Sequence, residues 1–167
     1  LYDFFSYSKF TRSANGMTPE EECGVGNVKA IKFWSRVKKL IPKARCIQLI
    51  GNHDDRIVKR ILDKSPEHEH IARDYIKRLT HFSGVETIDN SKEEFIYDGV
   101  CYMHGFRKFG EHATFNQMNT VTGHLHRAGL QYNENIDGSF FELNVGCLLN
   151  KKSPVFSYRA QNQLSKW

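Results

Sequence analysis

Three short apolar segments of this sequence each end at a polar motif that contains histidine. Residues 46–50 lead into Gly51-Asn52-His53-Asp54, residues 100–103 lead into His104-Gly105, and residues 120–122 lead into Gly123-His124-Leu125-His126. Short apolar runs that stop at Gly are typical of buried strands. Because α/β proteins gather functional groups at the carboxyl ends of strands, this pattern predicts an α/β fold whose three motifs meet at one site.

The first half of the chain also predicts helices. Thr18 can cap a helix, Pro19 suits its first position and Glu21 completes a capping box. Apolar residues then recur at helical spacing until Pro42, and we expect this stripe to face the core. Two charged amphipathic segments, residues 55–63 and 67–79, are interpreted as further helices.

The second half of the chain is rich in predicted strands. Residues 94–97 and 100–103 are joined by Asp98-Gly99, and residues 129–133 and 140–145 surround Asp137-Gly138, so each pair predicts a β-hairpin. Residues 155–158 are expected to add a last strand. With no repeat or linker in the sequence, we predict a single domain over residues 1–167.

Composition places the chain among ordinary globular proteins. Of 167 residues, 40% are hydrophobic and 26% are charged, which argues against disorder. No apolar run has the length of a membrane span, and we expect no membrane partner. The four cysteines form no Cys-x-x-Cys pair, so buried free thiols and a reducing cytoplasmic location are favoured.

The net charge of +5 suits a polyanionic partner. Two basic stretches carry much of this charge, and each fits a nucleic-acid track or a solvated helix face equally well. The first contains Lys32, Arg36, Lys38, Lys39, Lys43 and Arg45, and the second contains Arg56, Lys59 and Arg60.

Imidazole and oxygen donors without thiolates are the ligands of Mn²⁺, Fe, Zn²⁺ and similar ions. Gly-Asn-His-Asp alone is also an ordinary polar turn, and Gly-His-Leu-His alone is also an alternating strand. It is their order, with each motif at a predicted strand end, that favours a metal site. Arg107 and Lys108 follow His104-Gly105, where they could donate to a substrate phosphate or belong to a solvated loop.

The ordered motifs Gly-Asn-His-Asp, His-Gly and Gly-His-x-His resemble those of the calcineurin-like metallophosphoesterase family. The resemblance implies a two-layered β-sandwich flanked by helices, and hydrolysis of a phosphate ester by a hydroxide bound to two divalent ions. Asn52, His104 and His124 match the ligands of the second ion, and His126 matches a ligand of the first. His53 matches the histidine that protonates the leaving group, Asp3 matches its carboxylate partner, and Asp54 matches a variable structural position.

Two family motifs have no complete counterpart in this sequence. They are an Asp-x-His and a Gly-Asp-x-x-Asp block that supplies the bridging Asp. Leu1-Tyr2-Asp3 fits the last three residues of that block, so we expect the beginning of the domain, including its first strand or strands, to be missing. For both divalent ions Mn²⁺ is the first choice, and Fe, Zn²⁺ and Mg²⁺ are the alternatives.

The resemblance does not name a substrate. Residues 2–10 and 162–167 look like a phage and prophage subgroup, so a phage-encoded enzyme in the host cytoplasm and a nucleic-acid phosphodiester substrate are the first interpretation. A phosphomonoesterase acting on a phosphoprotein or a small phosphorylated molecule is the alternative. If the chain is complete, an inactive metal-binding or nucleic-acid-binding module is the third, and exposed sheet edges leave homo-oligomerisation open.

Overall fold

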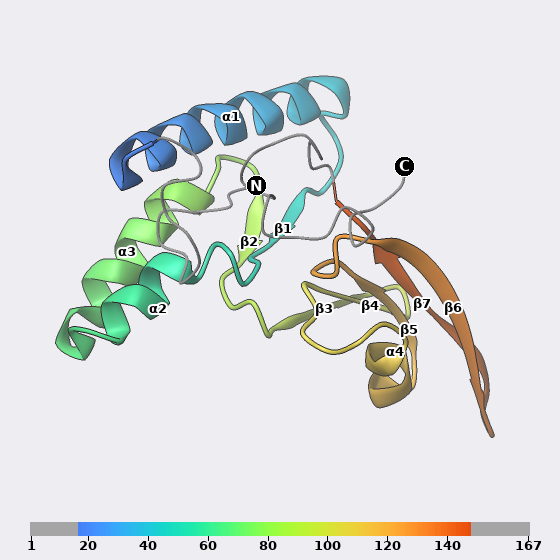
Figure 1. Cartoon of the computed structure of the whole chain (residues 1–167). Helices are drawn as coiled ribbons and strands as arrows, with labels where there is room; N and C mark the ends of the chain where they lie inside the picture. The colour runs from blue at the N-terminus through green and yellow to red at the C-terminus, as the bar shows by residue number, and fades with distance from the viewer. Residues whose placement is uncertain (1–16, 148–167) are drawn as a thin grey trace. The chain divides into compact units, whose positions relative to one another are not determined.

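The structure is a computed structural model that describes residues 17–147. It is a mixed α/β fold, which confirms the predicted class (Figure 1). The chain divides after Asp89 into two compact units, and each is described by itself. The prediction of one domain stays a prediction, and the expected strand at 155–158 and Asp3 lie outside the described residues.

The first unit opens with the long helix α1, Pro19–Leu40. Its capping box is complete, because the Thr18 side chain accepts from the Glu21 backbone N–H while the Glu21 carboxylate accepts from the Thr18 backbone N–H. The expectation that the apolar stripe faces the core is wrong for most of its length, because Val28, Ile31 and Leu40 are half exposed or more. Cys23 and Ala30 occupy the buried side instead.

The remaining elements of this unit follow α1 in the chain. They are β1 (Ile47–Leu49), α2 (Arg56–Leu62), a 3₁₀ turn η3 (Pro66–His68), α3 (Glu69–Thr80) and β2 (Glu86–Ile88). β1 and β2 form a parallel pair. Figure 1 shows α2 and α3 side by side. Their small and branched apolar residues meet those of α1 in one core: Cys23, Ala30, Ile57, Val58, Ala72, Ile76 and Leu79.

The second unit is a five-stranded mixed sheet in the order β3-β4-β5-β7-β6. Its strands are β3 (Glu94–Tyr97), β4 (Val100–Met103), β5 (Asn119–Thr122), β6 (Ala128–Asn135) and β7 (Gly138–Val145). β3–β4 and β6–β7 are antiparallel hairpins, as the turn signals predicted, and β4, β5 and β7 run parallel. A short helix, α4 (Glu111–Asn116), packs against β5 and β7.

The buried face of this sheet is unusually polar. Cys101, Met103 and Phe140 are accompanied at inward positions by a larger set of hydrogen-bonding side chains. This set consists of Thr120, Thr122, Glu142 and Asn144 on the strands, together with His112 on α4. Since buried polar groups are tolerated where they are hydrogen-bonded, such a face indicates an organised network.

All four cysteines are free thiols, and Cys46 and Cys101 are buried as predicted. Between residues 17 and 147, no helix combines the length and the hydrophobicity needed to cross a membrane.

Candidate metal centre

The parallel pairing of β4 with β5 brings two of the predicted histidines together. Met103 and Thr122 are register partners at the ends of these strands, so the next residues on both strands emerge at one sheet edge. The Gly123 N–H donates to the His104 carbonyl at 3.0 Å and extends the pairing by one step. His104 Nε2 and His124 Nδ1 are 3.2 Å apart, with the rings at 80° to one another.

This nitrogen spacing fits two neighbouring ligands of one divalent ion. With metal–nitrogen bonds of about 2.1 Å, two ligand atoms are about 3.0 Å apart at a right angle and about 3.4 Å apart at the tetrahedral angle. The observed 3.2 Å lies between these values. Both side chains are half-buried, so solvent reaches the pair. A hydrogen bond between the two rings is the other arrangement compatible with this distance.

The loop after β5 holds its histidines in an unusual backbone conformation. His124 and His126 have φ of 66° and 55°, in the left-handed region that side chains other than Gly seldom adopt. Each such residue costs on the order of 1–2 kcal/mol and persists where its surroundings enforce it. Leu125 N–H donates to the Gly123 carbonyl, and Cys147 Sγ donates to the His126 carbonyl. The loop is therefore constrained at both histidines.

Asn144 supports this loop from β7. Its side-chain amide donates to Thr122 Oγ1 at 3.1 Å and to the Gly123 carbonyl, and its oxygen accepts from the Gly146 N–H at 3.0 Å. It is buried, and its contacts fix the start of the His124 segment.

A second network holds the loop that follows His104. Glu142 is fully buried and accepts from the backbone N–H groups of His112 and Ala113 at 2.9 and 3.0 Å. His112 Nε2 accepts from the N–H groups of Phe106 and Arg107 at 3.0 and 2.9 Å. That nitrogen therefore carries no proton, so Nδ1 does, and it donates to Glu142 at 3.2 Å.

No role for His112 or Glu142 was predicted from the sequence. A signal was present, because a charged residue occupies an inward position between Phe140 and Asn144 on an alternating strand. Gly105, with φ of 90°, lies inside the same arrangement: a Cβ there would be 3.4 Å from His112 Nε2 and from Thr122 Cβ. The approach of the loop to the sheet thus favours glycine.

The predicted phosphate ligands lie in this second loop. The Arg107 guanidinium is 4.1 Å from the Phe115 ring centroid and 5.2 Å from that of Phe106, so aromatic faces hold it in place. The Lys108 backbone N–H donates to Glu111 at 3.3 Å, and its side chain is exposed.

The Gly51-Asn52-His53-Asp54 loop belongs to the first unit, between β1 and α2. Asp54 Oδ2 accepts from the Gly51 N–H at 2.8 Å and closes the turn, while Oδ1 is buried with no hydrogen-bond partner within 17–147. Burial raises the pKa of this carboxyl. Asn52 and His53 are half-buried in the turn that Asp54 closes, and their approach to the histidine pair stays a prediction.

In the part of the chain that the structure describes, no group of three or more His, Cys, Asp or Glu side chains is arranged to hold a metal ion. The His104–His124 pair offers two nitrogen ligands for a metal ion. Comparisons with protein-family models, with curated proteins and with solved structures found no match. The family resemblance therefore stays a prediction that rests on the motifs.

Proposed function

We propose that this chain is a divalent-metal-dependent phosphoesterase whose substrate is a nucleic-acid phosphodiester. One observation carries the proposal: His104 and His124 leave neighbouring parallel strands with their ring nitrogens at a spacing suited to a shared ion. Two further features support it. The His124 loop is held in a strained conformation, and buried networks brace the segments that follow β4 and β5.

In the proposed site, His104 and His124 would hold the second of two ions through neutral imidazole nitrogens together with Asn52, and His126 would be a ligand of the first. A divalent ion bound there would lower the pKa of water and stabilise the charge that develops on phosphoryl oxygens. Arg107, stacked on Phe115, presents its guanidinium N–H donors to a phosphate oxygen. As the resemblance implies, His53 would donate a proton to the leaving oxygen, with Asp3 as its carboxylate partner.

Metal binding is the first test, because it does not depend on knowing the substrate. Titration with Mn²⁺ or Co²⁺, followed by calorimetry or by the Co²⁺ absorption spectrum, should show binding that His104→Ala and His124→Ala each weaken by at least about 100-fold. His70→Ala, an exposed histidine on α3, is the matched control and should bind as the unchanged chain does. Equal binding by all four proteins would refute a site at the histidine pair.

Turnover separates the substrate classes. The proposal expects Mn²⁺-dependent cleavage of plasmid or single-stranded DNA that disappears in His124→Ala. Activity confined to p-nitrophenyl phosphate would instead support a phosphomonoesterase. Metal-independent DNA binding without cleavage would contradict the enzyme and favour a binding module.

The proposal also includes the two-layered β-sandwich that the resemblance implies, and it requires Asn52 to reach the ion in the folded chain. Bound Mn²⁺ broadens nuclear magnetic resonance signals of nearby nuclei. Signals of Asn52, His104 and His124 should therefore broaden together at low Mn²⁺ concentration. Broadening restricted to residues of the second unit would refute the shared site while leaving metal binding by the pair intact.

A further inference from the structure

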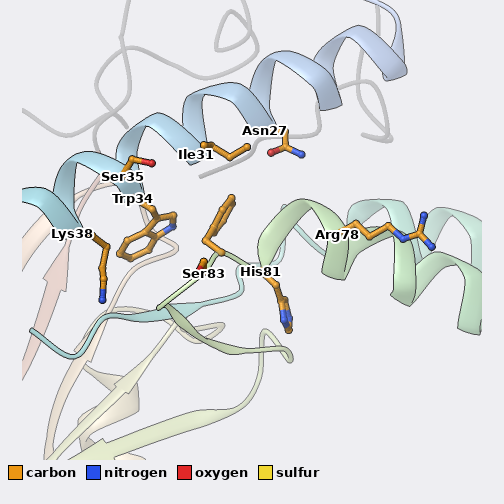
Figure 2. A pocket seen from close by; sticks show the side chains of 9 residues that line it. Asn27, Ile31, Trp34, Ser35, Lys38, Arg78, His81 and Ser83 are labelled. Atoms are coloured by element: carbon orange, nitrogen blue, oxygen red, sulfur yellow. The ribbon is translucent and has the colours of Figure 1, made fainter. Parts of the chain in front are cut away.

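The first unit contains a pocket of about 460 Å³ between α1 and the end of α3 (Figure 2). This volume lies within the usual range of small-ligand sites. Among residues 17–147, its lining contains cationic, aromatic and small polar side chains and no carboxylate. The lining residues are Asn27, Ile31, Trp34, Ser35, Lys38, Arg78, His81, Phe82 and Ser83.

Trp34 is fixed within this pocket by hydrogen bonds. Its indole N–H donates to Gln48 Oε1 of β1 at 2.8 Å. The Gln48 amide in turn donates to the Thr80 carbonyl at the end of α3 at 2.9 Å. Since the indole edge is held by β1 and α3, the ring is already ordered when a ligand arrives, and a flat ligand can stack on it at little entropic cost.

The charges of the pocket lie at its two ends. Figure 2 shows Lys38 at one end of the row of lining side chains and Arg78 at the other. Lys38 Nζ donates to the Gly84 carbonyl at 3.1 Å, which positions the ammonium and leaves its other N–H donors available. His81 Nε2 lies 2.6 Å from Asp89 Oδ1, so this ring is already engaged by a carboxylate. Lys38 and Arg78 therefore supply the positive potential.

From this arrangement we infer that the pocket binds a short segment of single-stranded nucleic acid, with a base against Trp34 and backbone phosphates at Lys38 and Arg78. A single phosphate would engage one end, whereas a continuous strand presents phosphates on both sides of a base. Aromatic stacking with cationic contacts to the backbone is the common mode of single-strand binding. This site is separate from the histidine pair and goes beyond the proposed phosphoesterase activity.

Fluorescence provides a direct test, because Trp34 and Trp167 are the two tryptophans of the chain. In a Trp167→Phe background, Trp34 is the sole tryptophan reporter. Adding a short oligothymidylate, with EDTA present to remove metal ions, should quench its emission. Thymidine and inorganic phosphate, tested separately, should each bind far more weakly than the strand.

Substitutions define the roles of the pocket residues. Binding of a fluorescein-labelled oligothymidylate should depend on salt with a logarithmic slope of about −1.4 for two single-strand phosphate contacts, and Lys38→Ala should reduce it to about −0.7. Lys39→Ala removes the same charge from the next position on α1, which does not line the pocket, and should leave the slope nearly unchanged. Trp34→Leu should weaken binding by between about 5-fold and about 150-fold.

Circular dichroism melting checks that each variant remains folded, and Arg78→Ala, at an exposed position, tests the charge contacts without disturbing Trp34. Equal effects of Lys38→Ala and Lys39→Ala would overturn the inference in favour of diffuse attraction. Concentration-dependent protection of Trp34 without nucleic acid would overturn it in favour of a second copy of the chain. Because EDTA is present, failure here leaves metal binding and phosphoesterase activity as separate questions.

Discussion

Glu142→Gln is the substitution that most directly tests the buried network behind the His104 loop. The carboxylate accepts three hydrogen bonds, from the backbone N–H groups of His112 and Ala113 and from His112 Nδ1. Because the Nδ1 proton of His112 is directed to Glu142, its Nε2 accepts hydrogen bonds from the backbone N–H groups of Phe106 and Arg107. In this hydrogen-bond network every donor is directed toward Glu142, directly or through His112. A glutamine amide at that position would place an N–H₂ donor where an acceptor is needed.

The expected loss can be worked out bond by bond. If His112 keeps its proton on Nδ1, that N–H faces the new amide N–H₂ and loses its acceptor, at about 1–3 kcal/mol. The two backbone bonds change from a charged to a neutral acceptor, and each weakens by about 1 kcal/mol. If the proton moves to Nε2 instead, the N–H groups of Phe106 and Arg107 lose their acceptor. Either way, the free energy of unfolding should fall by about 3 kcal/mol or more.

Urea denaturation followed by circular dichroism measures this difference, and Glu134→Gln on the exposed face of β6 is the matched control. The control should change stability by less than about 0.5 kcal/mol. Long-range ¹H–¹⁵N spectra of the unchanged protein should show His112 as the Nδ1–H tautomer. A Glu142→Gln loss no larger than that of the control would refute the reasoning, since relief of the buried charge would then cancel the lost bonds.

Four further predictions concern other parts of the molecule. His124→Gly should be about 1 kcal/mol more stable than His124→Ala, because Gly adopts the positive φ without strain, yet both should lose metal binding; equal stabilities in urea would contradict the strain. Thr18→Ala should lower the free energy of unfolding by about 1 kcal/mol through loss of the α1 cap. The hydrogen bonds of that cap hold the pKa of Glu21 below 4.5. The stabilising effect of the ionised Glu21 carboxylate should therefore be present above pH 4.5 and disappear as the pH falls through the lowered pKa. Circular dichroism should show this as a loss of helix that Glu21→Gln no longer shows. Burial raises the pKa of Cys101 from 9.0 to about 11, so the unfolded chain releases a proton that the folded chain keeps, and stability should fall as pH rises between these values; Cys101→Ala should flatten that slope in urea titrations.

The features that the sequence predicted correctly depend on local requirements. The hairpin at Asp98-Gly99 was predicted because such a turn needs positive φ at both residues, and the structure has 50° and 71° there. The start of α1 at Pro19 was predicted because the capping box lies within four residues. The close approach of His104 and His124 was expected from their places after strands, and the parallel pairing of those strands produces it.

The features that the sequence missed depend on distant residues. α4 is a six-residue helix whose first N–H groups donate to Glu142, thirty residues beyond His112. No local sequence pattern therefore predicts this helix. β2 has three residues and exists through its pairing with β1. The exposure of Val28 and Ile31 on α1 was missed because the stripe was judged from spacing alone, whereas packing selected the side with Cys23 and Ala30.

The polar face of the second unit also has a thermal consequence. Exposure of apolar surface on unfolding raises the heat capacity, whereas exposure of polar surface lowers it. A sheet that buries Thr120, Thr122, Glu142 and Asn144 beside few large apolar side chains should therefore unfold with a small heat-capacity change. Its stability curve would be broad and shallow, so the edge that carries His104 and His124 would keep its shape over a wide range of temperature.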